Sequence, residues 1–178
     1  METSRNIFLV GLMGAGKTTI GRQLAQRLRK EFIDADQEIV RRTGVRIGTI
    51  FEIEGEEGFR RRESAVLAEL AQGDAQVVAT GGGAVLSAAN REVMRAGGTV
   101  IYLRARLDHL WERTRHDTSR PLLATADPRA TLAGLLEARD PLYREVAHLI
   151  VDTGTQSAAT LVSRVVAALK ARESGSAA

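Results

Sequence analysis

The sequence predicts an α/β fold in which a parallel sheet is flanked by helices on both faces. Apolar runs alternate with helical patterns along the whole chain, and these runs are continuous rather than interleaved with polar residues. Strands of this kind are buried on both faces, as in parallel sheets whose connections are helices. The predicted strands are residues 7–10, 31–33, 76–79, 99–103 and 148–151.

Helices are predicted between the strands. Residues 17–30 carry isoleucine and leucine at four-residue spacing, with arginine and glutamine on the opposite side. Residues 157–172 repeat the pattern near the end of the chain. We therefore expect a single domain over residues 1–172 and a disordered tail over residues 173–178.

Composition narrows the possible functions. The 178 residues include no cysteine, which excludes disulfides, thiolate metal ligands and a cysteine nucleophile. No apolar stretch approaches the length of a membrane span and no secretion signal opens the chain, so we expect a cytoplasmic protein without a membrane partner. The formal net charge is +3 and no basic stripe is studded with aromatic residues, so we expect no nucleic-acid partner. The positive residues are nearly all arginine, which reflects genome composition or suits anionic ligands.

A glycine-dense loop, GLMGAGKTT, follows the first predicted strand. Gly11, four further residues and then Gly16-Lys17-Thr18 form the P-loop pattern. Glycines allow backbone N–H groups to turn inward around phosphate oxygens, and the following helix adds the positive end of its dipole. Lys17 can reach the β and γ phosphates, and the Thr18 hydroxyl suits Mg²⁺. The alternative is a glycine-rich turn with an exposed lysine, but the strand, loop and helix context favours phosphate binding.

Two other motifs follow predicted strands. FIDAD ends the second strand with Asp34 and Asp36, and residues two apart on an extended chain point to the same face. We therefore expect both carboxylates in one cleft, one near a metal and the other near a substrate hydroxyl. Alternatively, Asp36 caps the following helix. Three glycines at 81–83 follow the third strand, where their N–H groups can approach a ligand directly.

The segment GFRRRESAVLAEL has a helical period in which apolar residues form one stripe. Arg61 points away from the stripe, whereas Arg60 and Arg62 lie on its two flanks, so periodicity leaves two candidate arginines for a binding site. Glu63 falls inside the stripe, where an unpaired carboxylate would be costly. We predict that Glu63 pairs with Arg60, three residues before it.

Two segments interrupt the alternation of strands and helices. Residues 36–73 are long and helical, and we expect them to stand over the edge of the sheet. Residues 114–127 are polar and lie between two predicted helices, as a lid or a disordered insert. A lid is favoured because phosphoryl transfer has to exclude water. Arg120 and Arg139 each lie close to a proline, and singly they would be taken for surface arginines.

Together, these motifs resemble the shikimate kinase family. The matching segments are, in order, GLMGAGKTT, FIDAD, GEEGFRRRE, ATGGG, SRPLL and RDPLY. The likeness runs from about residue 7 to residue 166, and other small P-loop kinases share only the first motif. The resemblance implies a five-stranded parallel sheet of the nucleoside monophosphate kinase type and a monomeric enzyme. It also implies the phosphorylation of shikimate by ATP, giving shikimate 3-phosphate and ADP, in aromatic amino-acid biosynthesis.

The resemblance assigns residues to the nucleotide. Lys17 and the loop amides would hold the ATP phosphates, Arg113 would lie against the adenine, and Arg120 would meet the transferring phosphate. Thr18 would bind Mg²⁺, with Asp34 near the metal through water. The complete set is Gly14, Ala15, Gly16, Lys17, Thr18, Thr19, Arg113 and Arg120.

The resemblance also assigns residues to shikimate. Asp36 would take the attacking hydroxyl, as base or as orienter, while Arg60 and Arg139 would clamp the carboxylate. Gly82 would give a backbone contact, and Glu63 would support Arg60. The complete set is Asp36, Phe51, Phe59, Arg60, Glu63, Gly82 and Arg139, and the catalytic residues are Lys17, Asp36 and Arg120.

One departure from the family and two rival functions stay open. Some members carry an arginine after the last strand, where this chain has DTGTQS, so its base contacts and its selectivity for ATP are uncertain. A gluconate kinase and a non-catalytic nucleotide-binding module are the rivals. A GTPase-type switch is excluded, because its Asn/Thr-Lys-x-Asp element needs a lysine and the only lysines are at 17, 30 and 170.

Overall fold

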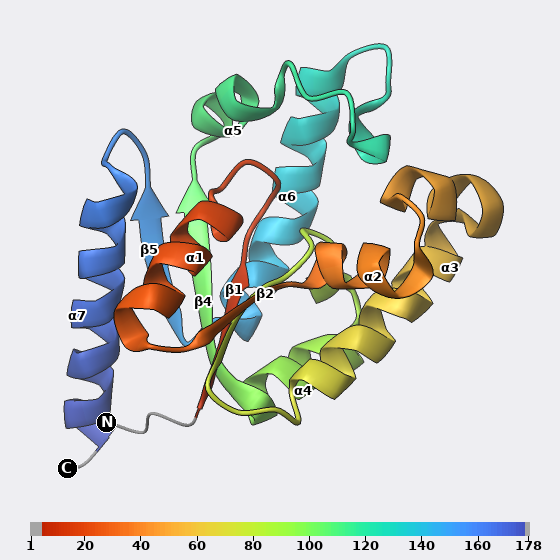
Figure 1. The fold of residues 1–178 in the computed structure, drawn as a ribbon. Coiled ribbons are helices and arrows are strands. Elements are labelled where there is room, and N and C mark those ends of the chain that lie inside the picture. Colours follow the sequence, from red (N-terminus) through yellow and green to blue (C-terminus); the bar gives the residue numbers. More distant parts are fainter. Residues whose placement is uncertain (1–4, 177–178) are drawn as a thin grey trace.

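The computed structural model describes residues 5–176, and its strands form one five-stranded sheet (Figure 1). The order is β2-β3-β1-β4-β5, and every pairing is parallel. The predicted fold class is confirmed, with strand ends that differ from the predicted ones by one or two residues. The strands are β1 (Asn6–Val10), β2 (Glu31–Asp34), β3 (Gln76–Ala79), β4 (Gly98–Ala105) and β5 (Leu149–Thr153).

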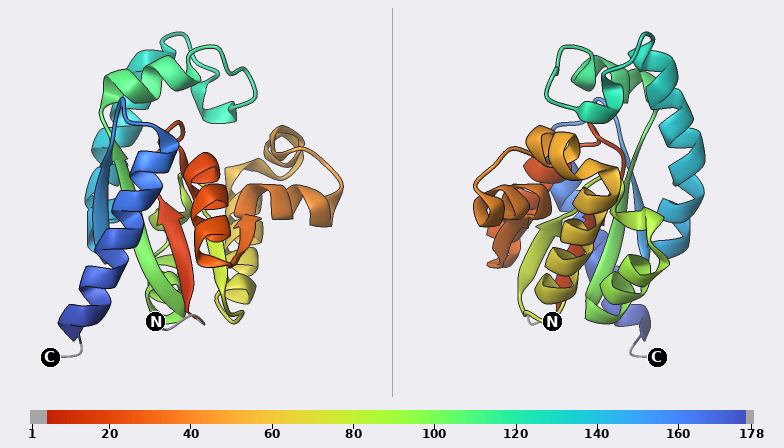
Figure 2. Two further views of the ribbon diagram at one scale, coloured as in Figure 1. Left: turned by 60° about the vertical axis from the view of Figure 1, so that its left-hand side comes forward. Right: turned by 90° about the vertical axis from the view of Figure 1, so that its right-hand side faces the viewer.

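Helices cover both faces of the sheet (Figures 1 and 2). Helices α1 and α7 pack side by side on one face, and α3, α4 and α6 lie on the other. This distribution follows from right-handed crossovers between parallel strands. The helices are α1 (Lys17–Leu28), α2 (Ala35–Thr43), α3 (Ile47–Leu70), α4 (Ala88–Gly97), α5 (Leu107–Thr114), α6 (Pro128–Val146) and α7 (Ala158–Ser176), with short 3₁₀ turns η1 (Ala84–Leu86) and η2 (Pro121–Leu123).

The hydrophobic core lies on the central strands. Phe8 and Leu9 of β1, Val78 of β3, and Ile101 and Leu103 of β4 have no exposed side-chain surface. Consecutive residues of a strand point to opposite faces, so burial of neighbours shows that both faces are covered. Among residues 5–176, no helix combines the length and the apolar character needed to cross a bilayer.

The register of the sheet determines where the motifs meet. Ala79 of β3 pairs with Leu9 of β1 on one side and with Asp34 of β2 on the other. The P-loop, Asp34 and the glycines 81–83 therefore follow three adjacent strands at the same edge of the sheet. Ligands of open α/β sheets bind outside this carboxyl edge.

The segment between α5 and α6 stands over that edge opposite α2 and the first part of α3, whereas the rest of α3 runs along the face of the sheet (Figure 2). Residues 36–73 contain most of α2 and all of α3, and α3 is broken at Gly55, whose φ of 70° and ψ of 179° are not helical. Residues 115–127 connect α5 to α6 and contain η2.

The predicted disordered tail is wrong for its first four residues. Residues 173–176 continue α7, and the Ser174 hydroxyl donates to the Lys170 carbonyl one turn earlier at 3.0 Å. Residues 173–175 are exposed, so the helix continues here through backbone bonds rather than through packing, because helix propagation is easier than nucleation. Residues 177–178 lie outside the described residues.

Candidate active site

The P-loop connects β1 to α1 through backbone conformations that favour glycine. Gly14 has a φ of 85° and Gly16 a φ of 94°, in the left-handed region that other residues adopt at a cost. Gly16 is also the N-cap of α1. Ala15 is buried, and its amide donates to the Leu12 carbonyl at 3.1 Å. The Ala15 amide, which we predicted to bind phosphate, therefore makes a hydrogen bond within the loop in this structure.

Lys17 folds back over the loop that precedes it. Its ammonium donates to the carbonyl oxygens of Gly11 at 2.6 Å and Leu12 at 3.1 Å. Burial lowers the pKa of Lys17 from 10.5 to about 8, although Asp36 and Asp34 act in the opposite direction. The side chain is thus held near the phosphate-binding amides in a weakly solvated place, where a phosphate charge would favour its protonated form.

Thr18 and Asp34 form a polar pair beside the loop. The Thr18 hydroxyl donates to Asp34 Oδ2 at 2.9 Å, and Asp34 Oδ1 accepts from the Gln37 amide at 3.1 Å as the N-cap of α2. Within the described part of the chain, no group of three or more histidine, cysteine and acidic side chains could hold a metal. One hydroxyl and one carboxylate nevertheless fit Mg²⁺, which keeps several waters and uses few protein ligands.

We expected Asp34 and Asp36 to share one face of an extended chain, and this expectation is wrong, although both side chains line one cavity. Asp36 lies in the first turn of α2 rather than on an extended strand, and Asp34, not Asp36, caps that helix. Asp36 Oδ1 is buried and has no hydrogen-bond partner. Burial raises the pKa of Asp36, and the negative charge of Asp34 raises it further. The positive charges of Lys17, Arg60 and Arg120 act in the opposite direction. An acceptor without a donor inside a cavity is suited to a ligand hydroxyl.

The glycines after β3 allow site side chains to come close to the backbone. A Cβ atom on Gly81 would lie 2.6 Å from Glu63 Oε2 and 2.9 Å from Asp36 Oδ1. A Cβ atom on Gly83 would overlap the Arg60 guanidinium. Glycine is therefore required here for the approach of protein groups, a reason that the sequence did not suggest.

Of the three consecutive arginines in α3, Arg60 faces the glycines. Arg60 Nη1 pairs with Glu63 Oε1 at 2.8 Å, and Glu63 is 1% exposed, so the predicted pairing is confirmed. Arg62 instead pairs with Glu54 at the surface. Arg61 is 67% exposed and pairs with Glu57. The structure thus selects Arg60 from the two arginines that periodicity left open.

Phe51 and Phe59, which the resemblance assigns to shikimate, lie next to Arg60. The rings of Phe51 and Phe59 are 5.0 Å apart, and the Arg60 guanidinium carbon lies 5.2 Å from the Phe59 ring centroid. A cation over a ring face is attracted by the ring electrons. These contacts hold Arg60 on the side of α3 that faces the glycines.

Arg139 is buried, contrary to its interpretation as a single surface arginine. It is 3% exposed in α6, and its Nη1 atom has no partner. A Cβ atom on Gly82 would lie 3.5 Å from that atom. A buried and unpaired guanidinium nitrogen is costly unless a ligand satisfies it, and a carboxylate suits its geometry.

Arg113 and Arg120 approach the P-loop from α5 and the segment that follows it. Arg113 donates to the Gly14 carbonyl at 2.9 Å and to the Gly154 carbonyl at 3.1 Å, so it joins the P-loop to the loop after β5. Arg120 pairs with Asp117 at 2.9 Å and lines the same cavity as Lys17. The region DTGTQS therefore lies next to Arg113, without an arginine of its own.

One cavity of about 380 Å³ collects most of the predicted nucleotide and catalytic residues. The residues assigned to shikimate that do not line it are Arg60, Arg139, Phe51, Phe59 and Glu63, of which Arg60, Glu63 and Arg139 lie against the glycines. Sequence reasoning missed Gln37 and Thr80, which line it as well, and Tyr143, which lies one turn after Arg139 in the motif RDPLY. The predicted residues in the cavity wall are Gly14, Gly16, Lys17, Thr18, Thr19, Asp34, Asp36, Gly82, Arg113 and Arg120.

A second cavity of about 710 Å³ lies between α6 and the ends of β4 and β5. Its walls include Tyr102, Leu136, Pro141 and Thr153, and none of the predicted site residues. The larger of these two cavities is therefore not the one that contains Lys17 and Asp36.

Comparisons with known proteins agree with this geometry. A family model described as shikimate kinase matches residues 13–170. A curated shikimate kinase from Nitrosospira multiformis is 64% identical over 152 residues, which is 85% of this chain and 78% of that protein. One from Bordetella pertussis is 61% identical over 167 residues, 94% of this chain and 79% of that protein. The structure of shikimate kinase from Acinetobacter baumannii in complex with shikimate matches with a TM-score of 0.94 at 49% identity, covering 96% of each chain.

Proposed function

The chain belongs to the shikimate kinase family, and we propose that its P-loop cavity transfers the γ-phosphoryl group of ATP to the 3-hydroxyl of shikimate. One observation carries this proposal: the P-loop lysine and Asp36, whose Oδ1 atom is buried and has no hydrogen-bond partner, line the same cavity. A phosphate donor bound by Lys17 and an acceptor hydroxyl bound by Asp36 would therefore meet in one place. The products are shikimate 3-phosphate and ADP.

At the nucleotide end, the loop amides and Lys17 bind the phosphates. Phosphoryl transfer depends mainly on positioning and on stabilising charge, so a preorganised cation is the main contribution of Lys17. Thr18 and Asp34 would hold Mg²⁺, which supplies charge neutralisation at the phosphate oxygens when bound. Arg113 would pack against the base from α5.

At the acceptor end, Arg60 and Arg139 bind the shikimate carboxylate from α3 and α6. Both guanidiniums lie against the glycines, Arg60 at Gly83 and Arg139 at Gly82. Binding energy at the carboxylate aligns the hydroxyl at the other end of the substrate. Phe51 and Phe59 form an apolar wall for the ring.

Asp36 accepts a hydrogen bond from the attacking hydroxyl. The pKa of Asp36 is raised toward neutral pH, and this makes its carboxylate a better proton acceptor than that of an exposed aspartate. Arg120, on the segment between α5 and α6, stabilises the charge on the transferring group. This segment closes over the cavity and excludes water.

The test is an ADP-release assay with shikimate, gluconate and nucleoside monophosphates as acceptors. We expect ADP release with shikimate and little with the others, and strongly reduced release in Asp36→Asn. Release with gluconate but not shikimate would point to the rival kinase. Nucleotide binding without release for any acceptor would point to a non-catalytic module.

A further inference from the structure

Tyr143 is a buried residue of α6 to which the reaction scheme above gives no role. It lies one helical turn after Arg139 and has no exposed surface. Its hydroxyl donates a hydrogen bond to the carbonyl oxygen of Gly82. Burial raises the pKa of this hydroxyl, and the nearby Arg139 guanidinium offsets the effect only in part. The proton therefore stays on the oxygen and is available to Gly82.

Gly82 lies between the two halves of the site. A Cβ atom on Gly82 would lie 3.5 Å from Arg139 Nη1, 3.6 Å from the Gly11 carbonyl oxygen and 3.6 Å from the Met13 amide nitrogen. Its backbone is thus packed between the shikimate arginine of α6 and the P-loop. A small shift of Gly82 would therefore change the position of bound shikimate relative to Arg139.

We propose that Tyr143 is a positioning residue for shikimate. Its hydroxyl holds the Gly82 carbonyl, and the peptide at Gly82 in turn presents its backbone to the substrate at a defined distance from Arg139. The inference rests on the proposed function of Gly82 and Arg139, because Tyr143 acts through Gly82.

The Tyr143 ring is held by contacts that do not involve the hydroxyl. Its ring packs on that of Tyr102 with centroids 5.0 Å apart. The Tyr102 hydroxyl donates to Asp140 at 2.7 Å and does not contact Gly82. The pair therefore offers two matched phenylalanine variants, each of which removes one hydroxyl from the same ring pair.

The first test compares the kinetics of Tyr143→Phe and Tyr102→Phe. In Tyr143→Phe we expect kcat/KM for shikimate to fall about tenfold, mainly through KM, with KM for ATP changing by less than about twofold. In Tyr102→Phe we expect both constants to stay within about twofold of the parent. Equal effects in the two variants, or an equal rise of both KM values in Tyr143→Phe, would show a general structural role and overturn the proposal.

The second test does not require Tyr143→Phe to fold. The chain has two tyrosines, so 3-fluorotyrosine incorporated into Tyr102→Phe labels position 143 alone. We expect its ¹⁹F resonance to shift on saturation with shikimate and to move much less with ADP. A resonance unchanged by saturating shikimate would contradict the proposal.

Failure of this inference differs from failure of the proposed function. If the parent chain does not phosphorylate shikimate, the function itself is wrong. If the parent is active, and Tyr143→Phe behaves as Tyr102→Phe or the ¹⁹F resonance does not respond, only the role of Tyr143 is wrong.

Discussion

Three ionisable side chains of the site are buried where their charges are poorly solvated. Burial is the largest cause of the lowered pKa of Lys17 and of the raised pKa values of Asp36 and Glu63. The charged form of each group would be more stable in water than it is in the free protein. Functional sites often retain such groups at the expense of stability, because a bound ligand can satisfy them.

The lowered pKa of Lys17 predicts that the protein takes up protons when it binds ATP in mildly alkaline solution. With a pKa of about 8, part of the free protein carries a neutral Lys17 at pH 8.5. The phosphate charge favours the protonated form, so binding should raise this pKa and draw a fraction of one proton from the buffer. Calorimetry in two buffers of different ionisation enthalpy measures this uptake, and Lys17→Ala provides the control.

The same variant tests the catalytic role of Lys17. Turnover of Lys17→Ala should fall by roughly a hundredfold or more, as expected for loss of a preorganised charge. A near-normal turnover would remove Lys17 from the mechanism. For the free protein, the unfolded chain binds more protons between pH 8 and 10.5, so the contribution of Lys17 to the free energy of unfolding rises with pH in that window.

We expect Arg60 to bind the carboxylate of shikimate and to neutralise the buried Glu63, and the two roles can be separated by experiment. Arg60→Ala should weaken shikimate binding about tenfold or more while leaving ATP affinity nearly intact. It should also destabilise the fold by about 3 kcal/mol, because Glu63 becomes an unpaired buried carboxylate. Calorimetry and urea unfolding measure the two effects.

A second substitution is the control for this prediction. In Arg60→Ala/Glu63→Gln, the neutral side chain should restore most of the stability but not the shikimate affinity. Arg61→Ala removes a surface arginine of the same helix and should change neither. Recovery of shikimate binding in the double variant would disprove the clamp.

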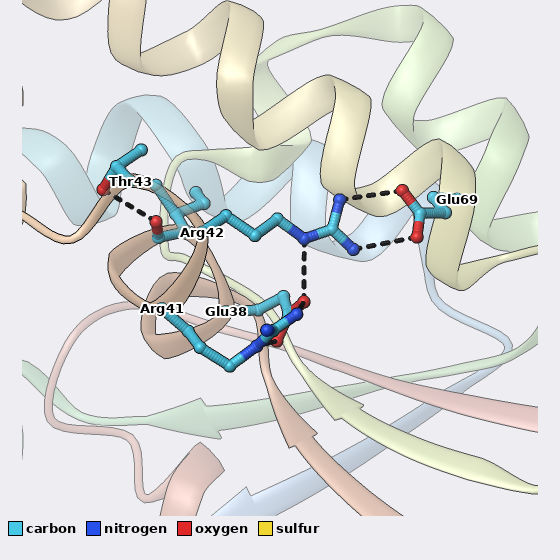
Figure 3. Close-up of polar contacts among 6 residues, drawn as sticks. Glu38, Arg41, Arg42, Thr43 and Glu69 are labelled. Atoms are coloured by element: carbon cyan, nitrogen blue, oxygen red, sulfur yellow. Dashed lines mark hydrogen bonds and ion pairs between the residues drawn. The ribbon is translucent and has the colours of Figure 1, made fainter.

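Helices α2 and α3 carry Asp36 and Arg60, two of the groups that we propose for shikimate binding, and a polar network joins the two helices (Figure 3). Arg42 of α2 donates to both oxygens of Glu69 of α3, at 2.7 and 2.9 Å, and to Glu38 of its own helix at 2.7 Å. The network is at the surface, so its contribution to stability is small. The Arg42–Glu69 pair also gives α2 a fixed point of contact with α3.

The network predicts a selective effect on shikimate. Arg42→Ala should raise KM for shikimate about threefold with little change in KM for ATP, because α2 and α3 lose a fixed contact. Arg41 also pairs with Glu38, but it makes no contact with Glu69, so Arg41→Ala is the matched control. Equal KM values for the two variants would show that the network has no influence on the site.

The segment between α5 and α6 should become protected when both ligands are bound. Residues 115–123 are largely exposed and carry Arg120 at the cavity wall, so closure would bring it onto the transferring phosphate. Limited trypsin digestion with ADP and shikimate together should cut this segment more slowly than with either ligand alone. Identical digestion rates in all samples would contradict closure.

A single copy of the chain supplies every residue that we assign to the reaction. The cavity wall is built from the P-loop, α2, the glycines, α5 and the segment between α5 and α6 of the same molecule. We therefore expect a monomer of 19.2 kDa in light scattering, with a specific activity that does not depend on enzyme concentration. Activity that falls on dilution would indicate a required dimer.

Local sequence patterns were sufficient for the sheet, the P-loop and the Arg60–Glu63 pair. The spacing of Gly11, Gly16 and Lys17 requires a particular backbone within one short loop, and the i, i+3 spacing of Arg60 and Glu63 places them one turn apart. Such relations involve few residues, so the residues themselves determine them. Even so, Asp36 shows the limit, because a helix begins at Ala35 where an extended chain was expected.

Other features depend on how distant segments pack. Arg60 is distinguished from Arg62 by the approach of Gly83, the packing of α6 buries Arg139, and Tyr143 reaches Gly82 from 61 residues away. Periodicity says which side of a helix is apolar, but not which backbone packs against it. The chain's motifs thus specified the chemistry and the kind of fold, whereas close packing between remote elements selected which candidate groups face the substrates.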